Sequence, residues 1–191
     1  MIVGDEQGKA GREAALDPRI ERTRAHVLGH ARDLLSDGGP SAVTYAELAT
    51  RARVTRQTLY RHWPTREALF VDLARERAGL GLTETSGPPE VIIGDFLRAM
   101  REGMDDVSNT APLTALIAQA DHDPTCDSAL MSTVAECHGL LNRMLEPSGL
   151  VLDAEQYARL VGPVMFQRFF AREPISDQLI EQLVTTWSDD R

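Results

Sequence analysis

The sequence predicts an all-α protein, and three observations support that fold class. Ten prolines divide the 191 residues into intervals that mostly suit single helices, because proline is tolerated in the first turn of a helix and breaks a helix from inside. Between the prolines, apolar residues recur every three or four positions, most clearly over 20–35, 130–145 and 160–169. Side chains typical of helix starts, such as Thr44 and Asp153, precede several of these stretches. We therefore expect about nine helices and no sheet.

The same signals divide the chain into four parts. Gly38-Gly39-Pro40 should stop a first helix that begins near Arg19, because glycine and proline both end helices. Asp153 and Ser176 are helix-start residues for the last two predicted helices. The predicted parts are a flexible arm (1–17), a small helical domain (18–64), a connecting helix (65–82) and a larger helical domain (83–191).

Composition excludes several classes of protein. Apolar residues make up 42% of the chain and charged residues 26%, as in a globular protein with a sizeable core. The two cysteines, Cys126 and Cys137, are too few for a disulfide framework and lack the spacing of metal ligands. Neither a signal peptide nor a run of about 18 apolar residues is present. We therefore expect a cytoplasmic protein without a membrane span, a bound metal or a cofactor.

Charge is unevenly distributed along the chain. The net charge is −9, yet the segment 19–66 carries nine arginines and four acids, a local balance of +5. From Thr83 to the end, seven arginines face 18 acids, a balance of −11. A basic segment is typical of nucleic-acid binding, and an acidic remainder confines contact with DNA to the basic face.

A helix-turn-helix is predicted within the basic segment, at residues 44–63, TYAELATRARVTRQTLYRHW. A short helix over 45–51 should bury Ala46, Leu48 and Ala49, and a second short helix starts after Thr55. Two such helices joined by a three-residue turn can place the second one in the major groove of DNA.

The exposed side chains of the second helix suit DNA recognition. Arg56 can donate two hydrogen bonds to guanine, and Gln57 can pair with adenine. Hydroxyls and helix-start N–H groups at Thr44 and Thr55 can bind phosphates. We expect base contacts from Arg56, Gln57, Tyr60 and Arg61, and phosphate contacts from Thr44, Tyr45, Thr55, His62 and Arg66.

The segment AELATRARVTRQTLYRHWPTREALF, with the helix before it, resembles the DNA-binding domain of the tetracycline-repressor (TetR) family. The resemblance covers roughly residues 16–70, and the matching positions are Ala49, Ala52, Val54, Thr58, Leu59, Tyr60, His62 and Leu69. Three positions depart from the family pattern. Arg53 and Gln57 stand where glycine is common, and Arg66 replaces a lysine. A left-handed turn residue at Arg53 would cost about 1 kcal/mol.

The resemblance implies a transcriptional regulator, usually a repressor, that binds a palindromic operator as a homodimer and is released by a small-molecule inducer. It implies that 18–64 binds DNA, while 83–191 binds the ligand and dimerises through its last two helices, 153–171 and 176–188. The inducer would favour a conformer in which the fourth helix holds the recognition helices at the wrong separation. The residues that would form the dimer interface are Leu160, Val164, Phe170, Leu179, Leu183 and Trp187.

The resemblance also implies an inducer pocket in the helical body. Candidate lining residues are Met100, Met104, Leu116, Cys137, Leu141, Met165, Phe166 and Phe169, with His122, His138, Asn142 and Arg143 as polar candidates. Methionine and phenylalanine suit an adaptable apolar pocket, although such residues more often belong to an ordinary core. The interface residues likewise could pack only within the chain.

Two other functions stay open at this point. An enzyme is disfavoured, because the sequence has no GxSxG, HExxH, phosphate-binding loop or dinucleotide fingerprint. A helical ligand- or protein-binding module whose helix-turn-helix does not read DNA would lack the steep salt dependence of true DNA binding.

Overall fold

The computed structural model describes residues 18–75 and 84–190, and within these ranges the chain is helical without a strand. The predicted all-α fold is confirmed. The predicted arm at 1–17 and the last part of the connecting helix lie outside the described residues. The helices are α1 (Pro18–Ala42), α2 (Tyr45–Ala52), α3 (Arg56–His62), α4 (Arg66–Arg75), α5 (Pro89–Asp105), α6 (Val107–Ala120), α7 (Pro124–Leu145), α8 (Ala154–Phe166) and α9 (Asp177–Asp189), with a 3-10 turn η1 (Glu146–Ser148) and a π-helical turn η2 (Gln167–Ala171).

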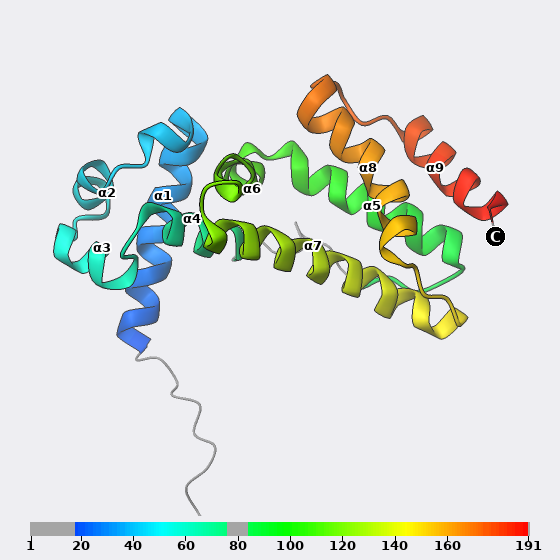
Figure 1. The fold of residues 1–191 in the computed structure, drawn as a ribbon, viewed down its shortest axis with the longest axis horizontal. Coiled ribbons are helices and arrows are strands. Elements are labelled where there is room, and N and C mark those ends of the chain that lie inside the picture. The colour runs from blue at the N-terminus through cyan, green and yellow to red at the C-terminus, as the bar shows by residue number, and fades with distance from the viewer. Residues whose placement is uncertain (1–17, 76–83, 191) are drawn as a thin grey trace, which may run out of the picture.

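Helices α1 to α4 gather at one end of the molecule, and the remaining helices form an elongated body (Figure 1). The long helices α5 and α7 run along this body, with α8 and α9 on one side of them. Helix α4 packs against α1 as well as against α6 and α7. It therefore connects the small end of the molecule to the body.

Two hydrophobic cores account for this shape. The first core joins α1 to α4, and it also takes in Ala115 and Leu116 of α6 and Cys126 and Ala129 of α7. The second core joins α5, α8 and α9 to the later turns of α7. Because α6 and α7 contribute to the first core, the small helical end is not packed independently of the body.

The predicted helix boundaries follow from local chemistry. Gly39 adopts a φ of 68°, which interrupts the helical geometry of α1 at the predicted Gly-Gly-Pro stop. The Asp153 carboxylate accepts from the Gln156 N–H at 2.8 Å, and the Gln156 side chain accepts from the Asp153 N–H at 2.9 Å. This reciprocal pair is the predicted capping box at the start of α8. In α2 one detail of the prediction was wrong, because Ala46 is exposed while Ala52 is buried.

Candidate DNA-binding surface and ligand pocket

The turn between α2 and α3 has the geometry of a helix-turn-helix. Arg53 closes α2 in the left-handed conformation, with φ 53° and ψ 41°. The Val54 N–H donates to the Ala49 carbonyl at 3.1 Å, which satisfies one of the last carbonyls of α2. The turn does place Arg53 in the left-handed region, so the cost considered for a non-glycine residue at this position applies.

Helix α3 is fixed from its buried side. The Leu59 and Trp63 side chains lie in the first core. The Thr55 hydroxyl caps the helix by accepting from the Thr58 N–H at 3.1 Å. These anchors hold one face of α3 inward and leave the opposite face free to meet a partner.

The four side chains predicted to contact bases lie on that outer face. Arg56, Gln57, Tyr60 and Arg61 are all exposed. Gln57, Tyr60 and Arg61 also border one open hollow of the surface. Within residues 18–75 and 84–190, neither Arg56 nor Arg61 has an ion-pair or hydrogen-bond partner. Two cationic side chains and one amide therefore project together from a single short helix.

The residues predicted to contact phosphates differ in whether their side chains still have a hydrogen-bond donor available. Thr44 and Thr55 are exposed at helix starts, where each hydroxyl accepts from a backbone N–H. The Thr44 hydroxyl keeps its own hydrogen to donate, whereas the Thr55 hydroxyl also forms a hydrogen bond with the Thr58 hydroxyl at 2.9 Å, in which either can be the donor. The Tyr45 hydroxyl instead donates to the Trp63 carbonyl at 2.5 Å. Burial, then Tyr60 and Glu67, raises the pKa of Tyr45 to about 12. Because its only hydroxyl hydrogen is already donated inside the domain, we no longer expect Tyr45 to donate to phosphate.

His62 and Arg66 are both half-buried. Burial lowers the pKa of His62, and the positive charges of Arg61 and Arg24 lower it further. The Arg66 guanidinium lies over the Phe70 ring at 5.5 Å and donates to the Pro40 carbonyl at 3.4 Å. A guanidinium has five N–H donors, so Arg66 keeps others for a phosphate.

Helix α4 is tied to the helix-turn-helix through one carboxylate. Asp72 accepts from the Trp63 indole N–H at 2.6 Å and forms an ion pair with Arg24 of α1 at 2.5 Å. The Arg24 guanidinium also lies over the Trp63 ring, 5.6 Å from its centre. A movement of α4 would therefore be passed directly to α1 and to the end of α3.

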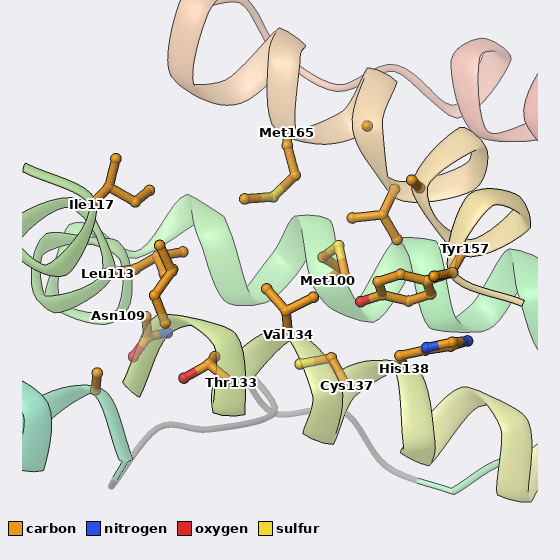
Figure 2. A pocket seen from close by; sticks show the side chains of 16 residues that line it. Met100, Asn109, Leu113, Ile117, Thr133, Val134, Cys137, His138, Tyr157 and Met165 are labelled. Atoms are coloured by element: carbon orange, nitrogen blue, oxygen red, sulfur yellow. The ribbon is translucent and has the colours of Figure 1, made fainter. Parts of the chain in front are cut away.

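A cavity of about 350 Å³ lies in the body, bordered by α6, α7 and α8 (Figure 2). Ala74 of α4 contributes to its wall, two residues beyond Asp72. The cavity size is within the range of ligand pockets in proteins, about 300–1,000 Å³. Its position places α4 between the cavity and the helix-turn-helix.

Three of the eight predicted lining residues, Met100, Cys137 and Met165, do border this cavity. The others have different surroundings, so for them the prediction is corrected. Met104 and Leu141 are fully buried in the second core, and Leu116 is buried in the first. Phe166 is exposed, and Phe169 packs against the second core.

The sequence analysis missed the polar groups of the cavity, except for His138. Figure 2 shows Tyr157 at one end, with its hydroxyl directed inward, and Asn109 at the other end. Tyr157 precedes Val161 and Met165 at steps of four, so helical spacing could have identified it. Of the other polar candidates, none lines the cavity: Asn142 hydrogen-bonds to Leu152, and His122 and Arg143 are exposed.

The six residues predicted at a dimer interface also separate into two groups. Leu160, Val164 and Trp187 are only 3%, 0% and 8% exposed, because they pack in the second core of their own chain. They leave little surface for a partner, and for them the prediction is corrected. Leu179 and Leu183 are half-buried, whereas Phe170 is 77% exposed and stacks on Phe166.

The described part of the chain offers neither a membrane-spanning helix nor a metal site. No helix there is long and apolar enough to span a membrane. Among the same residues, no three His, Cys, Asp or Glu side chains are grouped so that they could hold a metal ion.

Comparisons with known proteins agree with this geometry. The family model for bacterial regulatory proteins of the tetR family matches residues 27–73. The uncharacterized HTH-type transcriptional regulator YdeS of Bacillus subtilis (strain 168) is 26% identical over 93% of this chain and 91% of its own. The crystal structure of the TetR family transcription regulator SCO0332 superposes with a TM-score of 0.67 at 25% identity, covering 89% of this chain and 98% of that one.

A more distant structure shares the fold. The multidrug binding protein EbrR, complexed with imidazole, is 17% identical, with a TM-score of 0.67 over 93% of this chain and 97% of its own. The match to the helix-turn-helix, the full-length relative and the shared architecture agree with one another. Residues 27–73 therefore match the DNA-binding domain of the tetR family of bacterial regulatory proteins, and the whole chain is similar in sequence and fold to transcriptional regulators of that family.

Proposed function

We propose that the protein is a repressor that binds a palindromic operator as a homodimer and is released when a small molecule occupies the cavity of the body. The observation that carries this proposal is the double role of α4. Asp72 joins α4 to the helix-turn-helix, and Ala74 of the same helix lines the cavity. A ligand that moves α4 would therefore change the position of α3.

In the proposed complex, α3 lies in the major groove. Arg56 and Gln57 read bases, with Tyr60 and Arg61 one turn later on the same exposed face. The proposed phosphate contacts come from Thr44, Thr55, His62 and Arg66, all at the ends of short helices or beside them. Phosphate contacts fix the position of the protein on DNA, and base contacts select the sequence.

The domain division is proposed with the sequence-based boundaries. Residues 18–64 bind DNA, 65–82 connect, and 83–191 bind the ligand and dimerise. The first core continues into α6 and α7, which couples the DNA-binding part to the body rather than leaving it a separate module.

The proposed dimer interface lies on the outer surface of α8, η2 and α9. Phe166 and Phe170 stack on each other at 5.8 Å while 59% and 77% exposed. Leu179 and Leu183 are half-buried on α9. A paired copy would cover these apolar side chains, and a two-fold dimer places two recognition helices about 34 Å apart on DNA.

The proposed regulation is a population shift. The ligand need only bind one position of α4 more tightly than the other, because differential affinity alone changes the populations. A protein of the same fold, the multidrug binding protein EbrR, has a crystal structure in complex with the small molecule imidazole. For the present chain, the cavity beside Ala74 is the proposed site of that ligand.

Selection of binding sites from random duplex DNA tests the proposal. The purified protein should enrich a palindrome at near-physiological salt, and affinity for it should fall by orders of magnitude between about 50 and 200 mM salt. The Gln57→Ala variant should change preference at one base step in each half-site, by about 1–3 kcal/mol. Ser132→Ala, on the exposed surface of α7, is the matched control.

Three outcomes would count against the proposal. Absence of enrichment from a folded protein would favour the alternative of a binding module that does not read DNA. Enrichment of a single, non-repeated half-site would overturn the dimeric mode. An unchanged motif with Gln57→Ala would remove its role in base reading.

A further inference from the structure

The walls of the cavity beside α4 hold no carboxylate, ammonium or guanidinium group, and His138 contributes an imidazole. None of the 16 lining residues is Asp, Glu, Lys or Arg. Most are aliphatic, with Met100, Met165 and Cys137 adding three sulfur atoms. An ion entering such a cavity would leave its hydration shell without gaining a counter-charge, which is costly. The walls therefore select an uncharged ligand.

The Asn109 amide closes one end of the cavity. Its Nδ2 donates to the Gly103 carbonyl at 2.9 Å, which fixes the orientation of the amide. Its Oδ1 has no hydrogen-bond partner among the described residues, but this atom is fully buried, so a ligand in the cavity does not reach it. This end of the cavity therefore restricts the ligand by shape rather than by a hydrogen bond.

The other end offers a hydrogen-bond donor. The Tyr157 side chain is buried, and its ring stacks on His138 at 4.6 Å. His138 is itself held by the Leu152 carbonyl at 2.8 Å. Burial raises the pKa of Tyr157 far above its usual value, so the hydroxyl stays protonated. Figure 2 shows this hydroxyl directed into the cavity.

We infer that the ligand of this cavity is an uncharged, mainly apolar small molecule with a hydrogen-bond acceptor for the Tyr157 hydroxyl. The inference rests on the proposed function, since it names the chemical class of the proposed inducer. It excludes organic cations and carboxylates as good ligands of this chain.

Three matched compounds test the class, with binding measured by calorimetry on the full chain without DNA. Methyl 4-hydroxycinnamate is neutral, with an ester acceptor at one end. The free 4-hydroxycinnamate adds a charge, and 4-(1-propenyl)phenol removes the ester acceptor. The neutral phenol ester should bind once per chain, at least about tenfold more tightly than either of the other two.

Variants locate the binding. Gly162→Leu should abolish it, because Gly162 lines the cavity and a Cβ there meets no atom within 4 Å, so the added side chain has space and the helix can fold. Gly29→Leu is the matched control, since a Cβ at Gly29 of α1 also meets nothing within 4 Å and lies outside the cavity lining. It should leave binding unchanged.

One further variant tests the hydrogen bond. Tyr157→Phe removes only a hydroxyl, so it should weaken binding of the phenol ester about tenfold and leave binding of 4-(1-propenyl)phenol unchanged.

Opposite results would overturn the inference. Equal or tighter binding of the carboxylate, abolished by Gly162→Leu, would show that the cavity accepts charge. No saturable binding of the phenol ester below about 1 mM would rule out this class of ligand. A protein that binds the phenol ester but selects no palindrome would keep this inference and lose the repressor function, and the reverse result would do the opposite.

Discussion

At the scale of single residues, the left-handed Arg53 shows how one side chain can serve a site at the expense of stability. A non-glycine residue with a φ of 53° is strained by its own Cβ. Arg53 is exposed at the turn of the helix-turn-helix and has no ion pair within the described residues. Its positive charge is therefore exposed on the proposed DNA-binding side. A glycine at this position would adopt the same φ without strain but would supply no charge.

We expect Arg53→Gly to raise the free energy of unfolding by about 0.5–1 kcal/mol, because glycine adopts positive φ without strain. The same variant should weaken DNA binding through loss of a charge. Urea denaturation and fluorescence anisotropy measure the two effects. Arg172→Gly is a matched control, since Arg172 has a φ of 57° and lies at the end of η2. It should stabilise equally and leave DNA affinity unchanged; a loss of stability in both variants would contradict the strain.

His62 should make DNA binding depend on pH. The pKa of His62 in the free protein lies below the usual value of about 6.5, because the side chain is partly buried and the positive charges of Arg61 and Arg24 disfavour its protonated form. A nearby phosphate favours the protonated form, so the complex takes up a proton as pH falls through this range. We expect affinity to rise between about pH 7.5 and 5.5, by at most about tenfold per unit for each His62. Stability of the free protein should fall over the same range, since the unfolded chain binds protons more readily.

Anisotropy at constant ionic strength checks this pH dependence. In His62→Gln, which keeps an N–H donor, the slope should be lost. His122→Gln is the control, because His122 is exposed in the body. Identical slopes in wild type and His62→Gln would rule out proton uptake at this residue.

At the scale of helices, α4 is held to the DNA-binding end by Asp72. The side chains of Asp72 and Arg24 are only 18% and 31% exposed, so their ion pair is better shielded than a surface pair. The Trp63 indole shares the same carboxylate oxygen. One residue thus joins three helical segments that are separate in the sequence.

We expect Asp72→Asn to lower the free energy of unfolding by about 1–3 kcal/mol and operator affinity by about tenfold, because α3 loses its anchor to α4. Asp95→Asn is the matched control, since Asp95 pairs with Arg98 at 2.8 Å within one exposed stretch of α5. That change should cost well under 1 kcal/mol and leave DNA affinity intact. Equal effects of the two substitutions would mean that Asp72 has no special role in positioning.

Sequence patterns predicted the helices well and the lining of the cavity poorly, for a physical reason. Helix caps such as Thr55 and Asp153 act over three residues, so the sequence shows them directly. Whether an apolar residue lines the cavity depends on whether its side chain packs against a neighbouring helix or borders the space between the helices. Met100 and Met104 are one turn apart on α5, and only Met100 reaches the cavity. Helical spacing identifies apolar faces but not the gap between them.

At the scale of the whole molecule, the apolar side chains near the C-terminus that stabilise the fold differ from those in the proposed dimer interface. Trp187 and Leu160 are buried in the second core and stabilise the body, whereas Phe170 and Phe166 are exposed on its surface. Helical spacing alone grouped Trp187 with Phe170, because both belong to apolar stripes near the C-terminus. Only packing distinguishes the side chains that fold a chain from those that can join two.

We expect Phe170→Asp to shift the protein from dimer towards monomer by at least about tenfold in dissociation constant, because it places a charge in the proposed interface. Val151→Asp is the matched control, since Val151 is 75% exposed and precedes α8. Trp187→Ala should instead lower the free energy of unfolding by about 3–5 kcal/mol. Sedimentation velocity and urea denaturation distinguish the two effects, and a fully retained Phe170→Asp dimer would place the interface elsewhere.

The first core has a consequence for how the protein unfolds. Its side chains come from α1 to α4 and from α6 and α7, so melting the DNA-binding end exposes apolar surface on the body as well. The two ends should then lose structure together in one cooperative transition. A fragment that stops after α4 would lack Leu116 and Cys126, so it should expose apolar surface of the first core and aggregate. Natural selection for a stable DNA-binding domain would therefore also act on residues of α6 and α7 that do not contact DNA.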